Sequence, residues 1–327
     1  MSNLNNYLKR PIIVFGAGSI GERHLRNLHF LGFTKLLVFR KRKLPFRTLE
    51  NIKVTTLTTW DEVKKNKPIV AIISSPTSMH LLQTIECIKL GIHCLVEKPL
   101  SNNLNDFAKL NKALKKNNVY IHVGYMMRFH PLIKKIKQII NKNTYGNLLS
   151  LNSKWGEYLP DWHPWEDYRL SYAAKKELGG GVSLTLSHDI DLANYLINSK
   201  VLKSVIVKNF SSNLEIETES GSDLIVKYEN GSTANIHLNF HEKKKERFLK
   251  IVFDNASINF NFYKSELVIN SSNEVEKIIK LDNFNRNDLF IDQTKYFFSK
   301  INKFSTDDSL RNINESKLII KMCHDEL

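Results

Sequence analysis

The feature that most constrains the fold is a glycine-rich segment between an apolar run and a helix-like run. Residues 11–15 read PIIVF, as in a buried strand, and residues 16–21 read GAGSIG. Residues 22–31 have the composition and spacing of a helix. A G-x-G-x-x-G segment with a strand before it and a helix after it predicts a dinucleotide-binding turn. The alternative is a glycine-rich turn in another kind of α/β unit.

Each glycine of this segment has a predicted role. Gly16 permits the tight turn, Gly18 lets the backbone approach a pyrophosphate, and Gly21 lets helix and strand pack closely. The positive end of the following helix begins at Ser19 and Ile20, where it can stabilise the anion. These five residues are therefore predicted to bind the cofactor.

A basic run follows the second predicted strand, residues 35–39. A fold of this kind that prefers NAD places an acidic residue there for the ribose hydroxyl. This chain has Arg40 and Lys41 instead, followed by Arg42 and Lys43. Because Arg40 can bind the extra phosphate of NADP through a charge-assisted fork, we predict NADP as the cofactor, with NAD as the alternative. The other interpretation is a solvated loop in a basic protein.

Strand-like and helix-like runs then alternate up to residue 124. The expected strands lie near residue 54 and at 69–73, 92–96 and 119–123, and the expected helices at 61–65, 81–90 and 105–117. This alternation predicts an α/β domain with a doubly wound parallel sheet over residues 1–124.

The third of these strands ends abruptly in Glu97-Lys98-Pro99. Ligands of open α/β sheets bind beyond the carboxyl ends of the strands, so Lys98 is a candidate catalytic residue. A solvated surface lysine before a turn-forming proline is the alternative. The polar, proline-broken segment at residues 74–80, SSPTSMH, also follows a buried strand and is typical of a loop that lines a cofactor.

The pattern changes at residue 125 to a second domain, predicted over residues 125–327. A helix at 131–140 precedes a series of strand-like runs separated by turn signals. The expected strands are 148–155, 203–210, 222–228, 233–240, 248–254, 256–262 and 266–269, and the closing helices are 288–300 and 310–323. This order predicts an α+β domain with an open, mostly antiparallel sheet. Helices would cover one face, and the other would form a homodimer or homotetramer.

An aromatic segment, residues 158–172, interrupts the predicted strands and reads YLPDWHPWEDYRLSY. Loops of this composition on a rigid scaffold commonly bind ligands. A structural lid or a subunit contact is the alternative. The candidate substrate-binding residues here are Trp162, His163, Trp165 and Arg169.

A triple glycine at residues 179–181 leads into a second candidate site. His188, Asp191 and Tyr195 follow at spacings that share one helix face, and Asp189 lies beside the histidine. Thr185 and Asp189 are candidate substrate-binding residues. A histidine next to two carboxylates after a glycine turn is a candidate acid or base. A hydrogen-bonded structural histidine is the alternative.

Composition and residue spacing argue against nucleic-acid binding, metal binding and a membrane-spanning segment. The net charge is +15, but the lysines are spread along the chain, which argues against nucleic-acid binding. The three cysteines have no metal-binding spacing, so no metal is predicted and buried thiols are expected. The sequence contains no apolar run of the roughly 20 residues that a membrane span needs, and a cytoplasmic protein is expected.

Taken together, these motifs resemble those of the Gfo/Idh/MocA family of NAD(P)-dependent oxidoreductases. They occur in the family's order: IIVFGAGSIGERHLRNL, IVAIISSPTSMH, GIHCLVEKPLS, VGYMMRFHP and GGGVSLTLSHDID. The resemblance is strongest over residues 11–131 and 150–195.

The resemblance implies a Rossmann domain followed by a domain with an open antiparallel sheet. It implies hydride transfer on a sugar, cyclitol or related alcohol, with Lys98 near the nicotinamide and the reacting oxygen and Glu97 beside the cofactor. Arg128 would stand at the domain junction. The residues implied to line the nicotinamide side are Ser75, Pro76, Thr77 and His80.

The chain departs from the family pattern at one position. The family places an aspartate four residues after the triple glycine, where this chain has Thr185. Either His188 with Lys98 suffices for catalysis, or the chain is a weakened or inactive protein that binds cofactor or sugar. The aromatic segment and the SHDID run resemble those of a branch of the family that is found in bacterial surface-polysaccharide and sialic-acid-like sugar pathways. This implies an anionic substrate, either a sugar acid or a nucleotide sugar.

Overall fold

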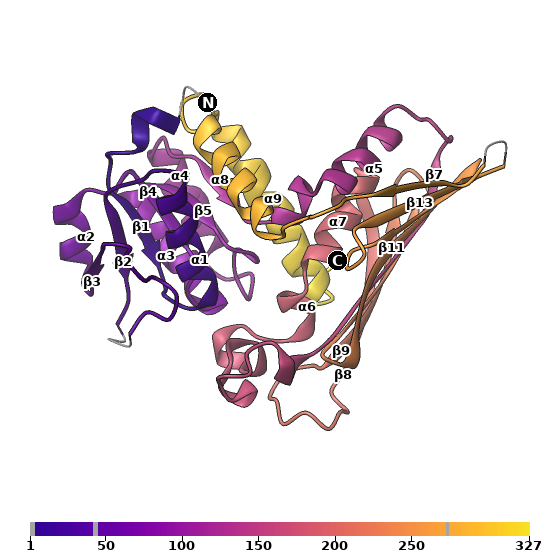
Figure 1. The fold of residues 1–327 in the computed structure, drawn as a ribbon, viewed down its shortest axis with the longest axis horizontal. Helices are drawn as coiled ribbons and strands as arrows, with labels where there is room; N and C mark the ends of the chain where they lie inside the picture. Colours follow the sequence, from indigo (N-terminus) through magenta and orange to yellow (C-terminus); the bar gives the residue numbers. More distant parts are fainter. Residues whose placement is uncertain (1–3, 42–44, 273–274) are drawn as a thin grey trace. The chain divides into compact units, whose positions relative to one another are not determined.

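The computed structural model describes residues 4–41, 45–272 and 275–327. They form two compact units (Figure 1). The first contains Met1–Gly124 and Asn287–Lys317, and the second contains Tyr125–Arg286 and Leu318–Leu327. The first change of unit along the chain follows Gly124. Residues 287–317, in contrast, were expected in the second domain and group with the first unit.

The first unit is built on a six-stranded parallel sheet with the order β3-β2-β1-β4-β5-β6. This is the predicted doubly wound α/β architecture. Its strands are β1 (Ile12–Phe15), β2 (Leu36–Phe39), β3 (Val54–Leu57), β4 (Val70–Ile73), β5 (His93–Val96) and β6 (Ile121–Val123). Its helices are η1 (Leu4–Tyr7), α1 (Ser19–Phe30), α2 (Trp60–Asn66), α3 (Thr77–Lys89), α4 (Phe107–Lys116) and α8 (Asn287–Lys300).

The register of this sheet brings the candidate loops to one edge. Phe15 at the end of β1 is paired with Phe39 of β2 and with Ile73 of β4, and Ile73 is paired with Val96 of β5. The loops that follow these four strands therefore leave the sheet at the same level. β1 and β4 are buried along their whole length, as continuous apolar strands of a covered parallel sheet should be.

The packing of α8 explains why residues 287–317 belong to the first unit. The side-chain amides of Asn27 on α1 and Asn287 exchange two hydrogen bonds, of 3.2 and 2.8 Å. The buried Phe297 stacks on Tyr120, which precedes β6, with ring centroids 5.6 Å apart. An amphipathic run predicts a helix, but its sequence does not say which sheet it will cover.

The second unit is built on an eight-stranded sheet with the order β14-β13-β12-β11-β7-β10-β9-β8. β7 and β10 are parallel and the other neighbouring pairs are antiparallel, so the expected mostly antiparallel sheet is confirmed. Its strands are β7 (Leu148–Tyr158), β8 (Val201–Asn209), β9 (Gly221–Tyr228), β10 (Thr233–Asn239), β11 (His241–Phe253), β12 (Ala256–Asn261), β13 (Glu266–Ser271) and β14 (Lys277–Lys280).

Helices cover one face of this sheet. α5 (Pro131–Asn141) and α7 (His188–Ile197) lie along it, as Figure 1 shows. The remaining helices are α6 (Val182–Thr185), α9 (Thr306–Cys323), which continues from the first unit, and the short η2 (Met126–Phe129), η3 (Leu159–Asp161), η4 (Tyr168–Leu170), η5 (Tyr172–Ala174) and η6 (Lys176–Leu178). Among the residues described, no helix combines the length and apolar character needed to cross a membrane.

The largest differences from the sequence-based expectation concern two strands, β11 and β14. β11 begins at His241 rather than at residue 248. Its first six residues are exposed or partly exposed, so they lack the alternation of buried and exposed side chains that would predict a strand. β14 was not predicted, since its four residues are short and polar at both ends.

Candidate functional site

The glycine-rich turn of the first unit leaves room for a phosphate group. Gly16 has φ of 89°, and a Cβ atom there would lie 2.8 Å from the Ser74 carbonyl oxygen and the Ser75 amide nitrogen. A Cβ at Gly21 would lie 2.1 Å from the Gly16 carbonyl oxygen. A Cβ at Gly18, in contrast, would meet no atom within 4 Å. Two glycines therefore close the turn, and the third opens the start of α1 to a ligand, as a dinucleotide pyrophosphate requires.

The basic run after β2 contributes described side chains at Arg40 and Lys41, whereas Arg42 and Lys43 lie outside the described residues. The Arg40 guanidinium stacks over the Phe46 ring at 3.9 Å from the centroid, and Lys41 is exposed. A further cation that no sequence motif indicated is Arg47, which donates a 3.1 Å hydrogen bond to the Ser19 hydroxyl at the start of α1.

A buried carboxylate on α1 fixes the segment that carries Arg47. Glu22 is only 2% exposed, and its carboxylate accepts the backbone N–H groups of Arg47 at 3.0 Å and Thr48 at 2.8 Å. The Thr48 hydroxyl adds a third bond of 2.5 Å. The cationic loop is thus tied directly to the helix that begins at the glycine turn.

The loop after β4 is organised by side chains of α3. The Ser75 hydroxyl donates to the Gln83 side chain at 2.7 Å, Pro76 precedes the helix, and Thr77 is buried in its first turn. His80, predicted to line the nicotinamide side, is 2% exposed. Its Nε2 lies 2.7 Å from the Ser75 carbonyl oxygen, and its Nδ1 lies 2.8 Å from the Pro99 carbonyl oxygen.

Lys98 follows β5 at the same edge of the sheet and is partly exposed. Its neighbour Glu97 lies 2.7 Å from Nε2 of His24, a buried α1 residue that the sequence analysis did not single out. Burial opposes ionisation of Glu97, but the hydrogen bond and charge of His24, with Lys98, hold the pKa of its carboxyl below the ordinary value. A carboxylate therefore lies next to Lys98 in the chain.

In the second unit, two residues of the triple glycine have no space for a side chain. Gly181 has φ of 102°, and a Cβ there would lie 2.6 Å from both carboxylate oxygens of Glu219. Glu219 also accepts the backbone N–H of Ser183 at 3.2 Å. A Cβ at Gly180 would lie 2.4 Å from the carbonyl oxygens of Tyr172 and Ala173. Glu219 therefore holds the backbone of the turn that leads into α6, and no sequence motif indicated this residue.

The turn delivers Thr185 and His188 to buried positions. Thr185 ends α6 and is 4% exposed, and His188 begins α7 and is 3% exposed. The His188 ring meets Tyr125 edge-on at 5.9 Å and lies tilted against Trp155 at 6.2 Å. Two aromatic rings therefore restrict the orientation of the candidate acid–base histidine.

Asp189, predicted to bind substrate, is fully buried, and both of its carboxylate oxygens accept hydrogen bonds. The Ser153 hydroxyl donates at 2.5 Å and the Arg247 guanidinium at 2.6 Å. The guanidinium lies 3.7 Å from the ring centroid of Trp155 and 4.2 Å from that of Phe262. Burial raises the pKa of the Asp189 carboxyl, and the charge of Arg247 opposes that shift.

Arg247 is the residue whose omission from the sequence analysis matters most. It stands at the end of a charged run that suggests a solvated surface. A signal was nevertheless present, because Arg247 has the same parity along β11 as the buried Leu249 and Ile251.

Arg128 makes the second ion pair of this unit with a fully buried carboxylate. Its Nε and Nη2 donate to the two carboxylate oxygens of Asp191 at 3.0 and 2.5 Å. The guanidinium also lies over the Tyr195 ring, 4.9 Å from its centroid. Asp191 therefore fixes Arg128, a bidentate arrangement that restricts the guanidinium in both position and plane.

The aromatic segment presents its predicted residues in different environments. Trp162 packs edge-on against Phe240 at 5.3 Å. The His163 and Trp165 rings lie 5.0 Å apart, and Trp165 is 61% exposed. Arg169 pairs with Asp167 at 2.8 Å and with Glu215 at 3.0 Å.

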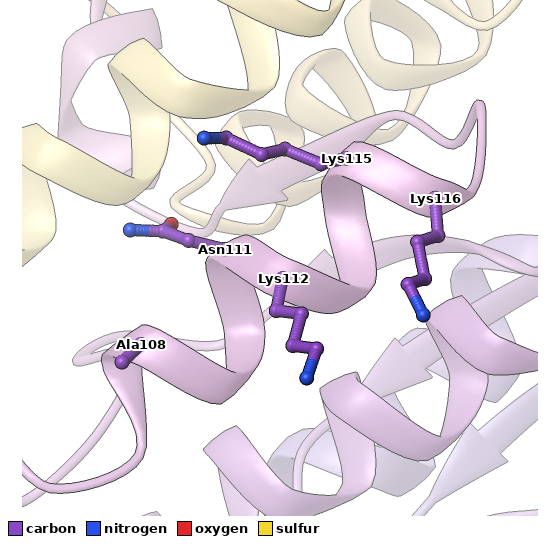
Figure 2. Close-up of a pocket in the computed structure, with 5 residues that line it drawn as sticks. All are labelled: Ala108, Asn111, Lys112, Lys115 and Lys116. Atoms are coloured by element: carbon purple, nitrogen blue, oxygen red, sulfur yellow. The ribbon is translucent and has the colours of Figure 1, made fainter.

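A surface hollow on α4 does not add to the candidate site. It is lined by Ala108, Asn111, Lys112, Lys115 and Lys116. In Figure 2, Lys112 and Lys115 extend from the helix in different directions, so their ammonium groups do not converge. Within the described ranges, no group of three or more His, Cys, Asp or Glu side chains is placed to hold a metal ion.

Comparison with curated proteins finds relatives of low identity. The chain is 25% identical over 244 residues to an uncharacterized oxidoreductase of Bacillus subtilis, covering 68% of this chain and 64% of that protein. It is 27% identical over 193 residues to myo-inositol 2-dehydrogenase of Thermotoga maritima, covering 58% of this chain and 55% of that one. These matches span less than two thirds of the relatives' own length.

Solved structures share the fold over almost the whole chain. Levoglucosan dehydrogenase in complex with NADH superposes with a TM-score of 0.81 at 16% identity, covering 97% of this chain and 98% of that one. UDP-N-acetylglucosamine 3-dehydrogenase from Acidithiobacillus ferrooxidans gives a TM-score of 0.74 at 16% identity, covering 96% of each chain. At such identities the likeness concerns the fold alone.

Two family models match the two halves of the chain in order. Residues 10–125 match the oxidoreductase family with an NAD-binding Rossmann fold, and residues 133–259 match the Gfo/Idh/MocA C-terminal domain. Together the matches cover more than half of the chain and include the glycine turn, Lys98, the triple glycine and His188. The chain is therefore a member of the Gfo/Idh/MocA oxidoreductase family.

Proposed function

We propose that this protein is an NAD(P)-dependent oxidoreductase that transfers a hydride to or from a hydroxyl or keto carbon of a sugar derivative. The observation that carries the proposal is the shared strand edge of the first unit. There the register of β1, β4 and β5 places an open glycine turn, the Ser75 loop and Lys98 at one level. A dinucleotide at a helix start and a cation beyond a strand end are what such chemistry needs.

The residues of the first unit would hold the cofactor. Backbone N–H groups at Gly18, Ser19 and Ile20 would bind the pyrophosphate, and Arg40 with Lys41 would face the adenosine ribose. The Ser75 loop and Glu97 would lie toward the nicotinamide. When bound, the nicotinamide supplies the hydride chemistry.

Lys98 and His188 are the proposed acid–base groups. The ammonium of Lys98 can stabilise the negative charge that develops on a reacting alcohol oxygen, and it can donate or accept the proton through Nζ. His188 can move a proton through its imidazole, while its aromatic neighbours restrict the ring. Arg128 and the aromatic segment, from Trp162 to Arg169, are proposed to bind hydroxyl or anionic groups of the substrate.

Replacing Lys98 tests the proposal directly. In Lys98→Met, kcat is expected to fall by about 10²- to 10⁴-fold, because a positioned proton-transfer group contributes that much. Cofactor affinity, measured by fluorescence titration, should change little. Lys112→Met on α4 is the matched control and should leave both quantities unchanged. An unaltered kcat in Lys98→Met would remove Lys98 from the chemistry.

NADP is the proposed cofactor, because Arg40 and Lys41 follow β2 where a fold that prefers NAD places an acidic residue. Arg47 adds a further cation, hydrogen-bonded to Ser19 at the start of α1. In Arg40→Ala, NADPH binding should weaken by roughly tenfold to a hundredfold, the value of a charge-assisted hydrogen bond. NADH binding should be nearly unchanged. Tighter binding of NADH than NADPH by the unaltered protein would contradict the preference.

A second candidate function is binding without turnover. Thr185 occupies the position where the resemblance calls for an aspartate, and a hydroxyl does not act as a base at neutral pH. Thr185→Asp separates the two functions. A rise in turnover from zero across a panel of sugars would identify a protein that lost its chemistry. Measurable turnover by the unaltered chain would favour the enzyme.

The proposed substrate class is a polyhydroxylated ring carrying an acid or a nucleotide, with a role in surface glycan synthesis. The names of the relatives, a cyclitol dehydrogenase, levoglucosan dehydrogenase and a UDP-sugar dehydrogenase, support a ring alcohol. Comparing turnover of neutral sugars, sugar acids and UDP-sugars tests it. A preference for neutral sugars would exclude the anionic class.

We also propose a homodimer or homotetramer formed through the uncovered face of the second sheet. Val205 and Ile225 are direct cross-strand neighbours there and are 44% and 60% exposed, and Val207 is 64% exposed. Ile225→Lys should shift the molecular mass measured by light scattering toward the monomer. A monomeric unaltered protein would refute this assembly.

A further inference from the structure

His80 occupies an unusual position between two loops of the first unit. It lies in the first turns of α3, is 2% exposed, and presents both ring nitrogens to backbone carbonyl oxygens. One belongs to Ser75, in the loop after β4, and the other to Pro99, immediately after Lys98. At 2.7 and 2.8 Å, both contacts have hydrogen-bond geometry.

The two acceptors restrict what the ring can do. A carbonyl oxygen only accepts, and a neutral imidazole carries one N–H donor, so both bonds are complete only in the doubly protonated ring. The ring faces two charged groups, Glu97 and Lys98, of which Glu97 raises and Lys98 lowers the pKa of His80. Burial is the largest influence, and the pKa is lowered overall.

The two carbonyls belong to the loops on which the proposed chemistry depends. Ser75 is also held by Gln83 through its hydroxyl, and the backbone N–H of Glu97 donates to the Ile73 carbonyl at 2.8 Å. Thr84, one turn after His80, donates its hydroxyl to the His80 carbonyl at 2.7 Å and so anchors the same helix. A shift of the ring would therefore disturb the backbone of both loops.

We propose that His80 is a positioning residue, which joins the cofactor loop at Ser75 to the Lys98 loop through its two ring nitrogens. The role rests on the two carbonyl oxygens that face its ring nitrogens. In the neutral ring one of the two bonds persists and the other is lost, so the connection is tightest in the doubly protonated form. The part of this proposal that concerns turnover rests on the proposed function.

The first test is spectroscopic and needs no substrate. Protein labelled with ¹⁵N in histidine is examined by long-range ¹H–¹⁵N correlation between acidic and neutral pH, with His80→Gln used for assignment. We expect two N–H signals from His80 at acidic pH. At neutral pH, one should remain and be protected from solvent exchange. A ring that exchanges its tautomers freely, or N–H groups that exchange as fast as those of an exposed histidine, would overturn the proposal.

The second test uses a graded series of variants. His80→Gln keeps one donor nitrogen and His80→Phe keeps the ring shape without any donor. A positioning role predicts a kcat loss of up to about 10²-fold, larger for Phe than for Gln, since small displacements from productive geometry have effects of that size. The cofactor dissociation constant should change much less than kcat.

Thr84→Val is the matched control, because it disturbs the same buried helix turn without touching either loop carbonyl. Its kcat should match that of the unaltered protein once thermal stability is accounted for. Equal kcat losses in all three variants would mean a general packing effect and would overturn the role of His80. If the protein proves to have no turnover, the spectroscopic result still decides the loop connection, so failure of the proposed function is distinguishable.

Discussion

The two units hold their candidate residues by different physical means. In the first unit, backbone groups do most of the positioning: a glycine turn, parallel strand ends in register, and carbonyl oxygens that meet His80. In the second unit, fully buried carboxylates position the candidate residues: Asp189 is paired with Arg247, and Asp191 is paired with Arg128. Each of these backbone features is signalled by a short stretch of sequence, such as the glycine-rich turn or the end of a strand, although the strands themselves pair across long separations. The ion pairs join residues about sixty positions apart.

This difference predicts different sensitivities to mutation. A buried ion pair contributes little when compared with an apolar replacement of both partners, but removal of one partner leaves an uncompensated charge. A glycine turn tolerates no side chain where space is absent and accepts one where it is present.

Arg247→Met should lower the free energy of unfolding by about 3–5 kcal/mol, since Asp189 would remain buried without its cation. Urea denaturation followed by tryptophan fluorescence is suitable, because Trp155, Trp162 and Trp165 all belong to the second unit. Lys175→Met, which removes an exposed pair with Glu217, is the control and should have far less effect. The double change Arg247→Met with Asp189→Leu should regain much of the loss. No regain would mean that the arginine acts mainly by its packing.

Gly16→Ala and Gly18→Ala form a matched pair in the first unit. The left-handed backbone of Gly16 costs an alanine about 1–2 kcal/mol, and its contacts with Ser74 and Ser75 add an overpacking loss of about 1–3 kcal/mol. Gly18 has φ of −77° and open space around it, so Gly18→Ala should fold normally but bind the cofactor weakly. Thermal denaturation and cofactor titration measure the two effects. Equal stability losses would show that the turn is closed at Gly18 as well.

His130 gives the second unit a pH-dependent stability. Its Nδ1 accepts the Leu132 N–H at 3.1 Å, and its ring packs against Phe260 and Phe284. Burial, together with the charge of Arg247, lowers the pKa of His130 to about 4.

Between this value and the unfolded value of about 6.5, the unfolded chain binds the proton first. Stability contributed by His130 is therefore complete above pH of about 6.5 and falls as the pH drops, by at most about 1.4 kcal/mol per pH unit.

His130→Asn keeps a capping acceptor at the start of α5 and removes the titration. The difference in unfolding free energy between the two proteins should therefore be independent of pH above about 6.5. Below that pH, it should change as the pH falls. A difference that is constant over the whole acidic range would contradict the assigned pKa direction.

Much of the first unit could be predicted from the sequence because its signals are local. The glycine turn, the strand ends and the boundary after Gly124 all depend on residues that are near one another in the chain. The basic run after β2 was located for the same reason. The assignment of α8 to the first sheet could not be predicted, because an amphipathic helix pattern does not identify its partner.

The candidate residues of the second unit show where prediction from the sequence ends. The triple glycine and His188 were found by their spacing, and the fold class followed from the alternation of the strands. Sequence alone did not show that Glu219 lies over Gly181, that Asp189 is enclosed by Arg247, or that Asp191 fixes Arg128. The type of a charged residue does not show whether its side chain is solvated or buried. Its burial is decided when distant strands and helices pack and remove water from both partners at once.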